Sequence, residues 1–339
     1  MTIFRRWSRL GLFWIATSLA AVVLASPARA DSFDAFVQGL WPEAKSHGVS
    51  RTTFDAAFDG VTSDPAVIEK TQTQAEFRKT VSEYLSSAVS DKRIALGQDK
   101  YKASERWLAK AEERYGVDRF IIMGVWGLET KYGTYMGDNN VIRALATLAA
   151  ARYRGTYFRS ELIKALVVLQ EGHIDAPHMI GSWAGAMGQT QFMPSNFKPY
   201  AVDFDGDGRR DIWTSVPDAL ASTAYFLRKH GWTPGEGWGY EVIAPTSDEA
   251  AGDGRHFAPF ASWTDKGYRR ADGESLPAAG RAALLRPAGA DGPAFLVTPN
   301  FNVIKRYNNS TSYALGVALL GDRIAGWGPL RAQWPVAAR

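Results

Sequence analysis

The sequence from Asp118 to Gly133, DRFIIMGVWGLETKYG, predicts one apolar helix with recognisable ends. Asp118 is suited to the N-cap position and Gly133 to the C′ position, so we expect the helix to lie between them. Gly124 and Gly127 each cost such a helix about 1 kcal/mol relative to alanine. We therefore expect that close packing or a ligand requires both glycines.

Glu129 is the candidate functional residue of this helix. Its helical neighbours at i−4, i−3 and i+3 are Val125, Trp126 and Tyr132, so its carboxyl group would be partly removed from water. Burial disfavours the charged form and raises the pKa, which suits a general acid that works near neutral pH. The alternative interpretation is a glutamate at a helix end that faces the solvent.

The first 30 residues have the composition of a secretory signal peptide. Three arginines precede an apolar run over residues 10–25, and Ala28-Arg29-Ala30 offers an A-x-A cleavage site. The run is short for a membrane span, which needs about 20 apolar residues. We therefore expect export to the periplasm with removal of residues 1–30, and a retained N-terminal anchor is the alternative.

The charge of the remaining chain is balanced. Four of the 39 basic residues and none of the 35 acidic residues lie in the first 30 positions, so the rest carries equal numbers of both signs. Neither nucleic acid nor an anionic membrane is therefore indicated as a partner. The chain has no cysteine, which excludes disulfides, thiolate metal sites and a lipid anchor on cysteine, so we expect its core to stabilise it. Its 12 Trp, 13 Tyr and 17 Phe fit either an aromatic core or a sugar-binding surface.

Helical spacing of apolar residues extends over most of the chain as far as His230, and the fold class we predict is α+β, mainly α. After residue 232 glycine and proline increase, and Tyr240–Ile243 and Ala294–Val297 have the composition of short strands. A helix is expected again over Tyr313–Leu320. The expected parts are an N-terminal helical region (31–115), a compact helical core (116–231), a small β-rich insertion (232–300) and a C-terminal segment that returns to the core (301–339).

The segment 181–197, GSWAGAMGQTQFMPSNF, carries no charge and contains three glycines. Gln189 and Gln191 stand among large apolar side chains, an arrangement that suits a surface for a neutral polar ligand. The alternative is a buried connector whose amide groups satisfy backbone atoms.

The segment 203–211, DFDGDGRRD, matches the first half of an EF-hand calcium loop. Carboxylates occupy positions 1, 3, 5 and 9, and Gly208 stands at position 6, where the loop turns sharply. Position 12 is Thr214 rather than glutamate, and Asp218 could complete the site. We expect a structural Ca²⁺ ion, and the alternative is a solvated acidic loop. The predicted ligands are Asp203, Asp205, Asp207, Arg209 (at position 7) and Asp218.

Three segments carry a resemblance to a known family. They are GVWGLETKYG (124–133), GSWAGAMGQTQFMPSNFKPYAVDFDGDGRRDIW (181–213) and KRYNNSTSYALGV (305–317), and ALATLAA (144–150) and FRSEL (158–162) also fit. Together they resemble the membrane-bound lytic murein transglycosylase B family, glycoside hydrolase family 103. The resemblance implies a lysozyme-like core within residues 116–231. Without a lipobox cysteine we expect a soluble member, with no peptidoglycan-binding domain after the core.

The resemblance implies cleavage, without water, of the β-1,4 bond between N-acetylmuramic acid (MurNAc) and N-acetylglucosamine (GlcNAc) in peptidoglycan. One glutamate protonates the leaving oxygen and then acts as base on the MurNAc 6-hydroxyl, which closes a 1,6-anhydro ring. By motif this glutamate is Glu129. No cofactor is expected for catalysis. The expected partners are glycan strands and cell-wall synthesis or remodelling proteins, and a monomer is favoured.

The resemblance also implies a set of residues that contact the glycan or its peptide. Two positions depart from the family pattern, because Phe226 stands where a tyrosine is common and Tyr153 replaces the usual partner of Arg154. Independently of the family, Tyr84 could face a ligand, although an aromatic residue at helical spacing usually belongs to the core. The predicted substrate-binding residues are Ser182, Trp183, Gln191, Tyr307, Asn308, Arg154, Tyr84 and Phe226.

A second catalytic carboxylate is hard to find in the sequence. Ordinary glycosidases use two, about 5–10 Å apart. The next acids after Glu129 are Asp138, Glu161 and Asp175, and none lies in the uncharged segment 181–197. This pattern fits a single-glutamate mechanism in which the 6-hydroxyl of the substrate attacks intramolecularly. The alternatives are a lysozyme-type hydrolase, a non-catalytic peptidoglycan-binding scaffold and, last, a calcium-regulated interaction protein.

Overall fold

The computed structural model describes residues 30–73, 79–246 and 252–335. The expected signal peptide, residues 1–30, therefore lies outside the described residues except for Ala30. Within the described ranges, no helix combines the length and the apolar character that crossing a bilayer requires.

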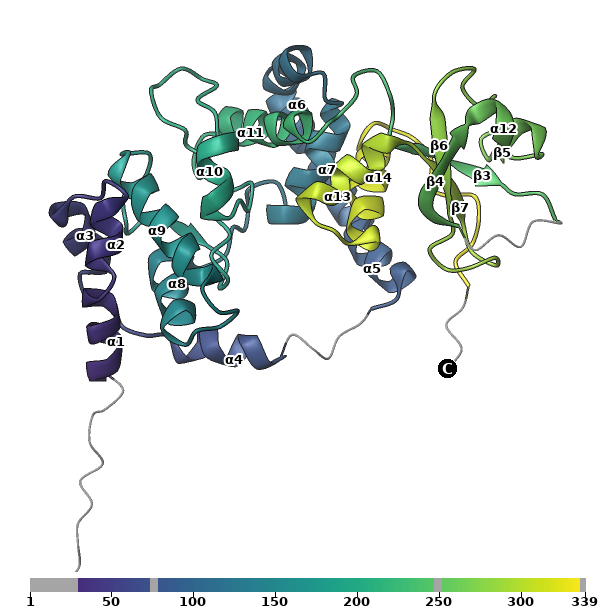
Figure 1. Cartoon of the computed structure of the whole chain (residues 1–339). Coiled ribbons are helices and arrows are strands. Elements are labelled where there is room, and N and C mark those ends of the chain that lie inside the picture. Colours follow the sequence, from purple (N-terminus) through teal and green to yellow (C-terminus); the bar gives the residue numbers. More distant parts are fainter. Residues whose placement is uncertain (1–29, 74–78, 247–251, 336–339) are drawn as a thin grey trace, which may run out of the picture.

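Six helices form the N-terminal part of the described chain, and α6 is 25 residues long (Figure 1). It ends where Gly116 adopts a left-handed conformation with φ of 68°. The first half of α6 buries only Ile94 and Gly97, whereas its second half buries Ser104, Leu108, Ala111 and Tyr115. The helices are α1 (Ala30–Gln38), α2 (Trp41–Ser46), α3 (Arg51–Phe58), α4 (Pro65–Thr73), α5 (Val81–Ala88) and α6 (Asp91–Tyr115).

The centre of the molecule is helical and encloses α7, which packs against α6, α11 and α14 (Figure 1). A two-stranded antiparallel sheet joins β1 to β2 in the same region. The last two helices, α13 and α14, bring the C-terminal part of the chain back to this core. The elements are α7 (Arg119–Thr130), β1 (Asn139–Asn140), α8 (Val141–Ala150), α9 (Tyr157–Gln170), β2 (Ile180–Gly181), α10 (Pro194–Tyr200), α11 (Val216–Lys229), α13 (Pro299–Tyr307) and α14 (Thr311–Ile324).

A five-stranded antiparallel sheet lies beside α14, at the other end of the molecule from α1 and α2 (Figure 1). Its strand order is β4-β6-β7-β3-β5. Two of its strands agree with the strands predicted from sequence to within one residue. The elements are β3 (Gly239–Ile243), β4 (Asp253–Pro259), α12 (Phe260–Asp265), β5 (Arg269–Arg270), β6 (Arg281–Leu285) and β7 (Ala294–Val297).

Helix α7 begins as predicted but ends earlier than predicted. The Asp118 carboxylate caps its first turn by accepting the Phe120 amide at 2.7 Å. The last helical residue is Thr130, and the left-handed backbone begins at Lys131 and continues through Tyr132 and Gly133, with φ of 50°, 60° and 77°. The prediction of Gly133 at C′ is therefore wrong. The chain turns early because this places the Tyr132 ring in the core, where it is 1% exposed.

The two glycines of α7 are required by close packing, as the sequence indicated. A Cβ atom on Gly124 would overlap the backbone carbonyl oxygen of Val317 in α14, and one on Gly127 would lie 2.7 Å from the Tyr132 ring. The contact between α7 and α14 is reciprocal. A Cβ atom on Gly321 of α14 would lie 2.6 Å from the carbonyl oxygen of Phe120. The backbones of these two helices are therefore nearly in contact.

We expect Gly124→Ala to lower the free energy of unfolding by about 1–3 kcal/mol, because overpacking outweighs the better helix propensity of alanine. Chemical denaturation measures this change. Gly237→Ala is the control, since a Cβ atom there meets open space and the change should stay within about 0.5 kcal/mol. Equal stability of the two variants would contradict the close α7–α14 contact.

Candidate active site

Glu129 lies one residue before the end of α7 and is partly buried. Burial raises the pKa of its carboxyl group to about 7. The Tyr313 hydroxyl donates a hydrogen bond to Glu129 Oε1 at 2.6 Å, and this bond opposes the increase because it stabilises the charged form. Near neutral pH the group is therefore present in both its protonated and its charged form.

Three tyrosines surround Glu129. Burial and the nearby Glu129 charge raise the pKa of Tyr84, Tyr307 and Tyr313, so all three hydroxyls stay protonated. The Tyr307 hydroxyl donates to the Thr190 carbonyl oxygen at 2.7 Å, whereas Tyr313 donates to Glu129 itself. Two residues predicted from sequence, Tyr84 and Tyr307, are thus brought to the candidate acid.

Within the described chain, no second carboxylate contributes to the pKa shift of Glu129. The pKa of its carboxyl group is set by burial and by the bond from Tyr313. Neighbouring carboxylates would raise that pKa through like-charge repulsion, as in sites that use an acidic pair. The local chemistry is therefore that of one carboxyl group among phenol rings.

The uncharged segment 181–197 is fixed against the end of α7 by buried hydrogen bonds. Gln189 Oε1 accepts the Trp126 indole N–H at 3.0 Å, and Gln189 Nε2 donates to the Trp213 carbonyl oxygen at 3.0 Å. The Thr130 hydroxyl donates to the Gln189 carbonyl oxygen at 3.0 Å. For Gln189 the buried-connector interpretation is therefore correct.

Gln191 and Ser182 have similar local roles. Gln191 has a left-handed backbone, with φ of 51°, and its Nε2 donates to the carbonyl oxygens of Met136 and Gly188 at 2.9 and 3.0 Å. Ser182 Oγ accepts the Ala186 amide at 3.0 Å. These bonds fix the shape of the segment, and Gln191 and Ser182 remain only partly buried.

The other predicted contact residues are more scattered. Phe226 is buried behind Tyr307, with ring centroids 4.8 Å apart, and Trp183 is half-buried against the core. Asn308 is exposed after α13, where its Oδ1 accepts a local backbone amide. Arg154 lies on the exposed turn between α8 and α9, and its guanidinium stacks on the Tyr153 ring at 5.4 Å. Among the described residues, no contact joins Arg154 to Glu129.

The acidic loop brings three of its predicted ligands together. Carboxylate oxygens of Asp203, Asp205 and Asp218 lie within 4.8 Å of one another. Burial and the Asp205 charge raise the pKa of Asp218 to about 6, while bonds from backbone amides oppose this increase. Asp207 instead pairs with the Arg209 guanidinium at 3.0 Å and is not part of this group. Three carboxylates form an all-oxygen donor set, which suits a hard cation.

The sequence matches the transglycosylase SLT domain over residues 32–322. This chain belongs to that family. It is 38% identical over 232 residues to membrane-bound lytic murein transglycosylase B of Escherichia coli, an alignment that covers 64% of this chain and 60% of that protein. The chain thus spans about three fifths of the length of that relative, and the resemblance to its family is confirmed.

Solved structures of SLT-domain proteins have the same fold. SltB3 from Pseudomonas aeruginosa, in complex with NAG-anhNAM-pentapeptide, has 44% identity and a TM-score of 0.87, with 90% of this chain and 83% of that chain covered. The Escherichia coli lytic transglycosylase Slt35, in complex with calcium, has 30% identity and a TM-score of 0.73, with 88% and 94% covered. The expected fold, mainly α with a lysozyme-like core and small β parts, is therefore confirmed.

Sequence reasoning on this SLT domain missed one residue of the site, Tyr313, which is the hydrogen-bond partner of Glu129. It did single out Gln189, which fixes the uncharged segment to α7. The chain has 13 tyrosines, and helical spacing cannot tell which hydroxyl reaches a carboxylate 184 positions away. The sequence signal for Gln189 was an amide side chain in an apolar, glycine-rich segment. Such an amide needs buried hydrogen-bond partners, which is the buried-connector interpretation.

We expect Tyr313→Phe to raise the pKa of Glu129 further above 7, because the bond that stabilises its charged form is lost. A hydrogen bond to a charged group contributes about 1.5–3 kcal/mol, which sets the scale of the change. The ¹³C chemical shift of the Glu129 carboxyl carbon, followed across pH, measures it. Tyr307→Phe is the matched control, since its hydroxyl donates to Thr190 instead. Equal effects of the two variants would disprove the assigned role of Tyr313.

Proposed function

We propose that this protein is a lytic transglycosylase that cleaves the MurNAc–GlcNAc β-1,4 bond of peptidoglycan and leaves a 1,6-anhydro-MurNAc end. The observation that carries the proposal is the partly buried carboxyl group of Glu129, whose pKa burial raises to about 7 with no second carboxylate contributing. Membership of the SLT-domain family supports the reaction class. The bound fragments in the SltB3 structures, NAG-anhNAM-pentapeptide and NAG-NAM-pentapeptide, support the substrate class.

Glu129 acts twice in this reaction. In its protonated form it donates its proton to the glycosidic oxygen, the bond from that oxygen to C1 of MurNAc breaks, and positive charge develops at C1. The resulting carboxylate then takes the proton of the MurNAc 6-hydroxyl, whose oxygen forms the new bond to C1. A pKa close to the working pH suits a group that must both give and accept a proton.

The hydrogen bond from Tyr313 distinguishes the two carboxyl oxygens. Because the Tyr313 hydroxyl occupies Oε1, we assign the transferred proton to Oε2. The same bond stabilises the carboxylate after the first transfer. Tyr313 is therefore a positioning residue that also adjusts the acidity of Glu129.

The 6-hydroxyl of the substrate takes the place of the nucleophile and water that ordinary glycosidases use. Hydrolysis by the usual routes needs a second carboxylate to attack C1 or to activate water. Glu129 has no such neighbour among the described residues, whereas an intramolecular hydroxyl gains the advantage of proximity. A lysozyme-type hydrolase is the second candidate, and it would leave a reducing end.

Two further parts of the proposal concern the environment of the protein. Export to the periplasm rests on the composition of residues 1–30, and glycan strands of peptidoglycan are the proposed partner. A structural Ca²⁺ ion would be held by Asp203, Asp205 and Asp218. The ion would neutralise three facing carboxylates and hold the loop against α11, and the relative Slt35 has been solved with calcium.

We expect Glu129→Gln to abolish turnover of purified sacculi while its melting temperature shows that the protein remains folded. Glutamine keeps the size of the side chain but cannot donate and then accept a proton. Mass spectrometry of the released muropeptides measures both turnover and product. In the unmodified protein the products should be lighter by one water than reducing-end products.

Glu105→Gln is the control for this experiment, because Glu105 is exposed on α6. It should retain full activity with the same anhydro products. Reducing ends from the unmodified protein would show a hydrolase, and turnover by Glu129→Gln would disprove the assigned acid.

We expect calcium at about 100 times its Kd to add about 2.7 kcal/mol to the free energy of unfolding, since the ion binds only the folded loop. Calorimetry in calcium and in chelator measures the difference. Asp203→Asn should remove it, whereas Asp99→Asn, exposed on α6, should not. Equal stability of the unmodified protein in calcium and in chelator would disprove the metal site.

A further inference from the structure

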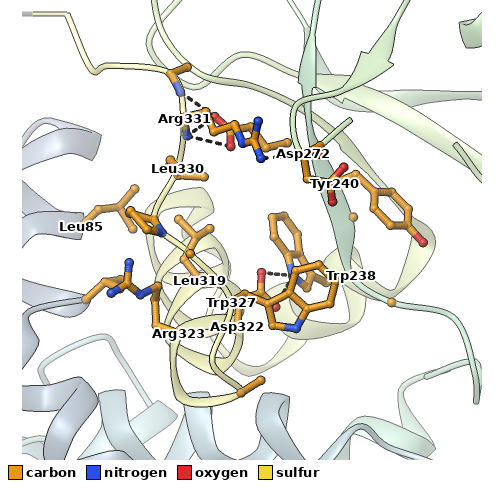
Figure 2. A pocket seen from close by; sticks show the side chains of 18 of the residues that line it. Leu85, Trp238, Tyr240, Asp272, Leu319, Asp322, Arg323, Trp327, Leu330 and Arg331 are labelled. Carbon is orange, nitrogen blue, oxygen red and sulfur yellow. Dashed lines mark hydrogen bonds between the residues drawn. The ribbon is translucent and has the colours of Figure 1, made fainter. Parts of the chain in front are cut away.

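A cavity of about 890 Å³ lies at the end of α7 opposite to Glu129. Its walls come from α5, α7, α14, the β3–β5 edge of the sheet and the chain that follows α14 (Figure 2). Asp118, the N-cap of α7, lines it, and the helix rise of about 1.5 Å per residue places Asp118 about 16 Å from Glu129 along the axis. The cavity is therefore separate from the site around Glu129.

At one end of the cavity the charged groups are already paired with one another. Arg270 forms an ion pair with Asp272, and the Glu241 carboxylate accepts the Arg331 backbone amide at 3.0 Å. Figure 2 shows Asp272 and Arg331 together at this end. These groups have little remaining capacity to bind a ligand.

The opposite end of the cavity is lined by aromatic and polar side chains that can still contact a ligand. Figure 2 shows Asp322, Trp238 and Trp327 close together there. Asp322 accepts the Trp238 indole N–H at 3.1 Å, and burial raises the pKa of Asp322 to about 7. The Trp327 ring is 59% exposed, although it belongs to the cavity wall. Within the described chain, the buried Nε of Arg323 has no hydrogen-bond partner.

The balance of charge indicates the kind of ligand. Four acidic residues and three arginines line the cavity, and Asp322 is only partly charged near neutral pH, so neither a strong cation nor a strong anion is favoured. The acidic residues are Asp118, Glu241, Asp272 and Asp322, and the arginines are Arg270, Arg323 and Arg331.

The geometry indicates a ligand with one apolar face and polar edges. An exposed indole offers a flat apolar surface, while a carboxyl group accepts hydrogen bonds and a guanidinium donates them. A pyranose ring has the matching parts, since its C–H groups form flat faces and its hydroxyls lie around the rim. A volume of about 890 Å³ is within the range of small-molecule sites.

We propose that this cavity is a second saccharide-binding site, in which Trp327 stacks on a sugar ring and Asp322 binds its hydroxyl groups. The identity of the saccharide as peptidoglycan glycan rests on the proposed function, whereas the site itself does not. A second attachment point, in a cavity at the opposite end of α7 from Glu129, would hold an insoluble polymer at the enzyme between cleavage events, which raises its effective concentration.

The test uses the Glu129→Gln protein, which should bind without cleaving, and tri-N-acetylchitotriose as the probe. Indole N–H signals in NMR report on each site separately, after assignment by Trp→Phe variants. Trp126, bonded to Gln189, reports on the site around Glu129, and Trp238 and Trp327 report on the cavity. We expect the Trp238 and Trp327 signals to shift and reach saturation.

Trp327→Ala should weaken binding at the cavity about tenfold, as read from the Trp238 signal, and leave the Trp126 response unchanged. The Trp327 ring is exposed, so its loss should not unfold the protein. Tyr157→Ala, an exposed aromatic on α9, is the matched control and should leave both responses unchanged.

The outcomes separate this inference from the proposed function. A shift of the Trp126 signal alone overturns the second site and leaves the proposed function intact. Shifts of the cavity signals without a Trp126 response support the second site and count against the proposed role of the site around Glu129. Shifts of the cavity signals with propylamine but not with the saccharide would overturn the inference in favour of a cationic ligand.

Discussion

The near-contact of two helix backbones determines the geometry of the candidate site. Gly124 of α7 faces the Val317 carbonyl oxygen of α14, and Gly321 of α14 faces the Phe120 carbonyl oxygen of α7. Side chains are absent at both crossing points, so the distance between the helices is fixed by backbone atoms, which cannot change rotamer. Glu129 and Tyr313 lie on these two helices, and their 2.6 Å hydrogen bond depends on that distance.

The sequence predicted those structural features that depend on residues close together in the chain. The Asp118 N-cap, the need for glycine in α7, the two short strands and the acidic loop all follow from residues within a few positions of one another. Glu129 was predicted to be partly desolvated because its helical neighbours are apolar, and its carboxyl group is partly buried, with burial raising its pKa to about 7. A family resemblance added the expected reaction and the lysozyme-like core.

The parts that could not be predicted depend on contacts between distant residues. The bond from Tyr313 to Glu129 joins positions 184 apart, and no periodicity encodes it. Helix α7 ends at Thr130 rather than near Gly133, because Lys131 and Tyr132 already adopt left-handed backbones, an arrangement that buries the Tyr132 ring in the core. The ion pair of Asp207 with Arg209 is the exception, since it joins residues two positions apart, yet the loop pattern did not predict it.

The buried carboxyl group of Glu129 also links folding to acidity. In the folded protein it holds its proton up to about pH 7, whereas the unfolded chain releases it near the ordinary value of 4.5. Between these values the native state binds more protons than the denatured state, so alkalinisation through this window favours denaturation. Asp322, whose pKa is also raised to about 7, acts in the same direction. The protein should therefore resist denaturation best in mildly acidic surroundings, as a consequence of the same burial that suits Glu129 to proton transfer.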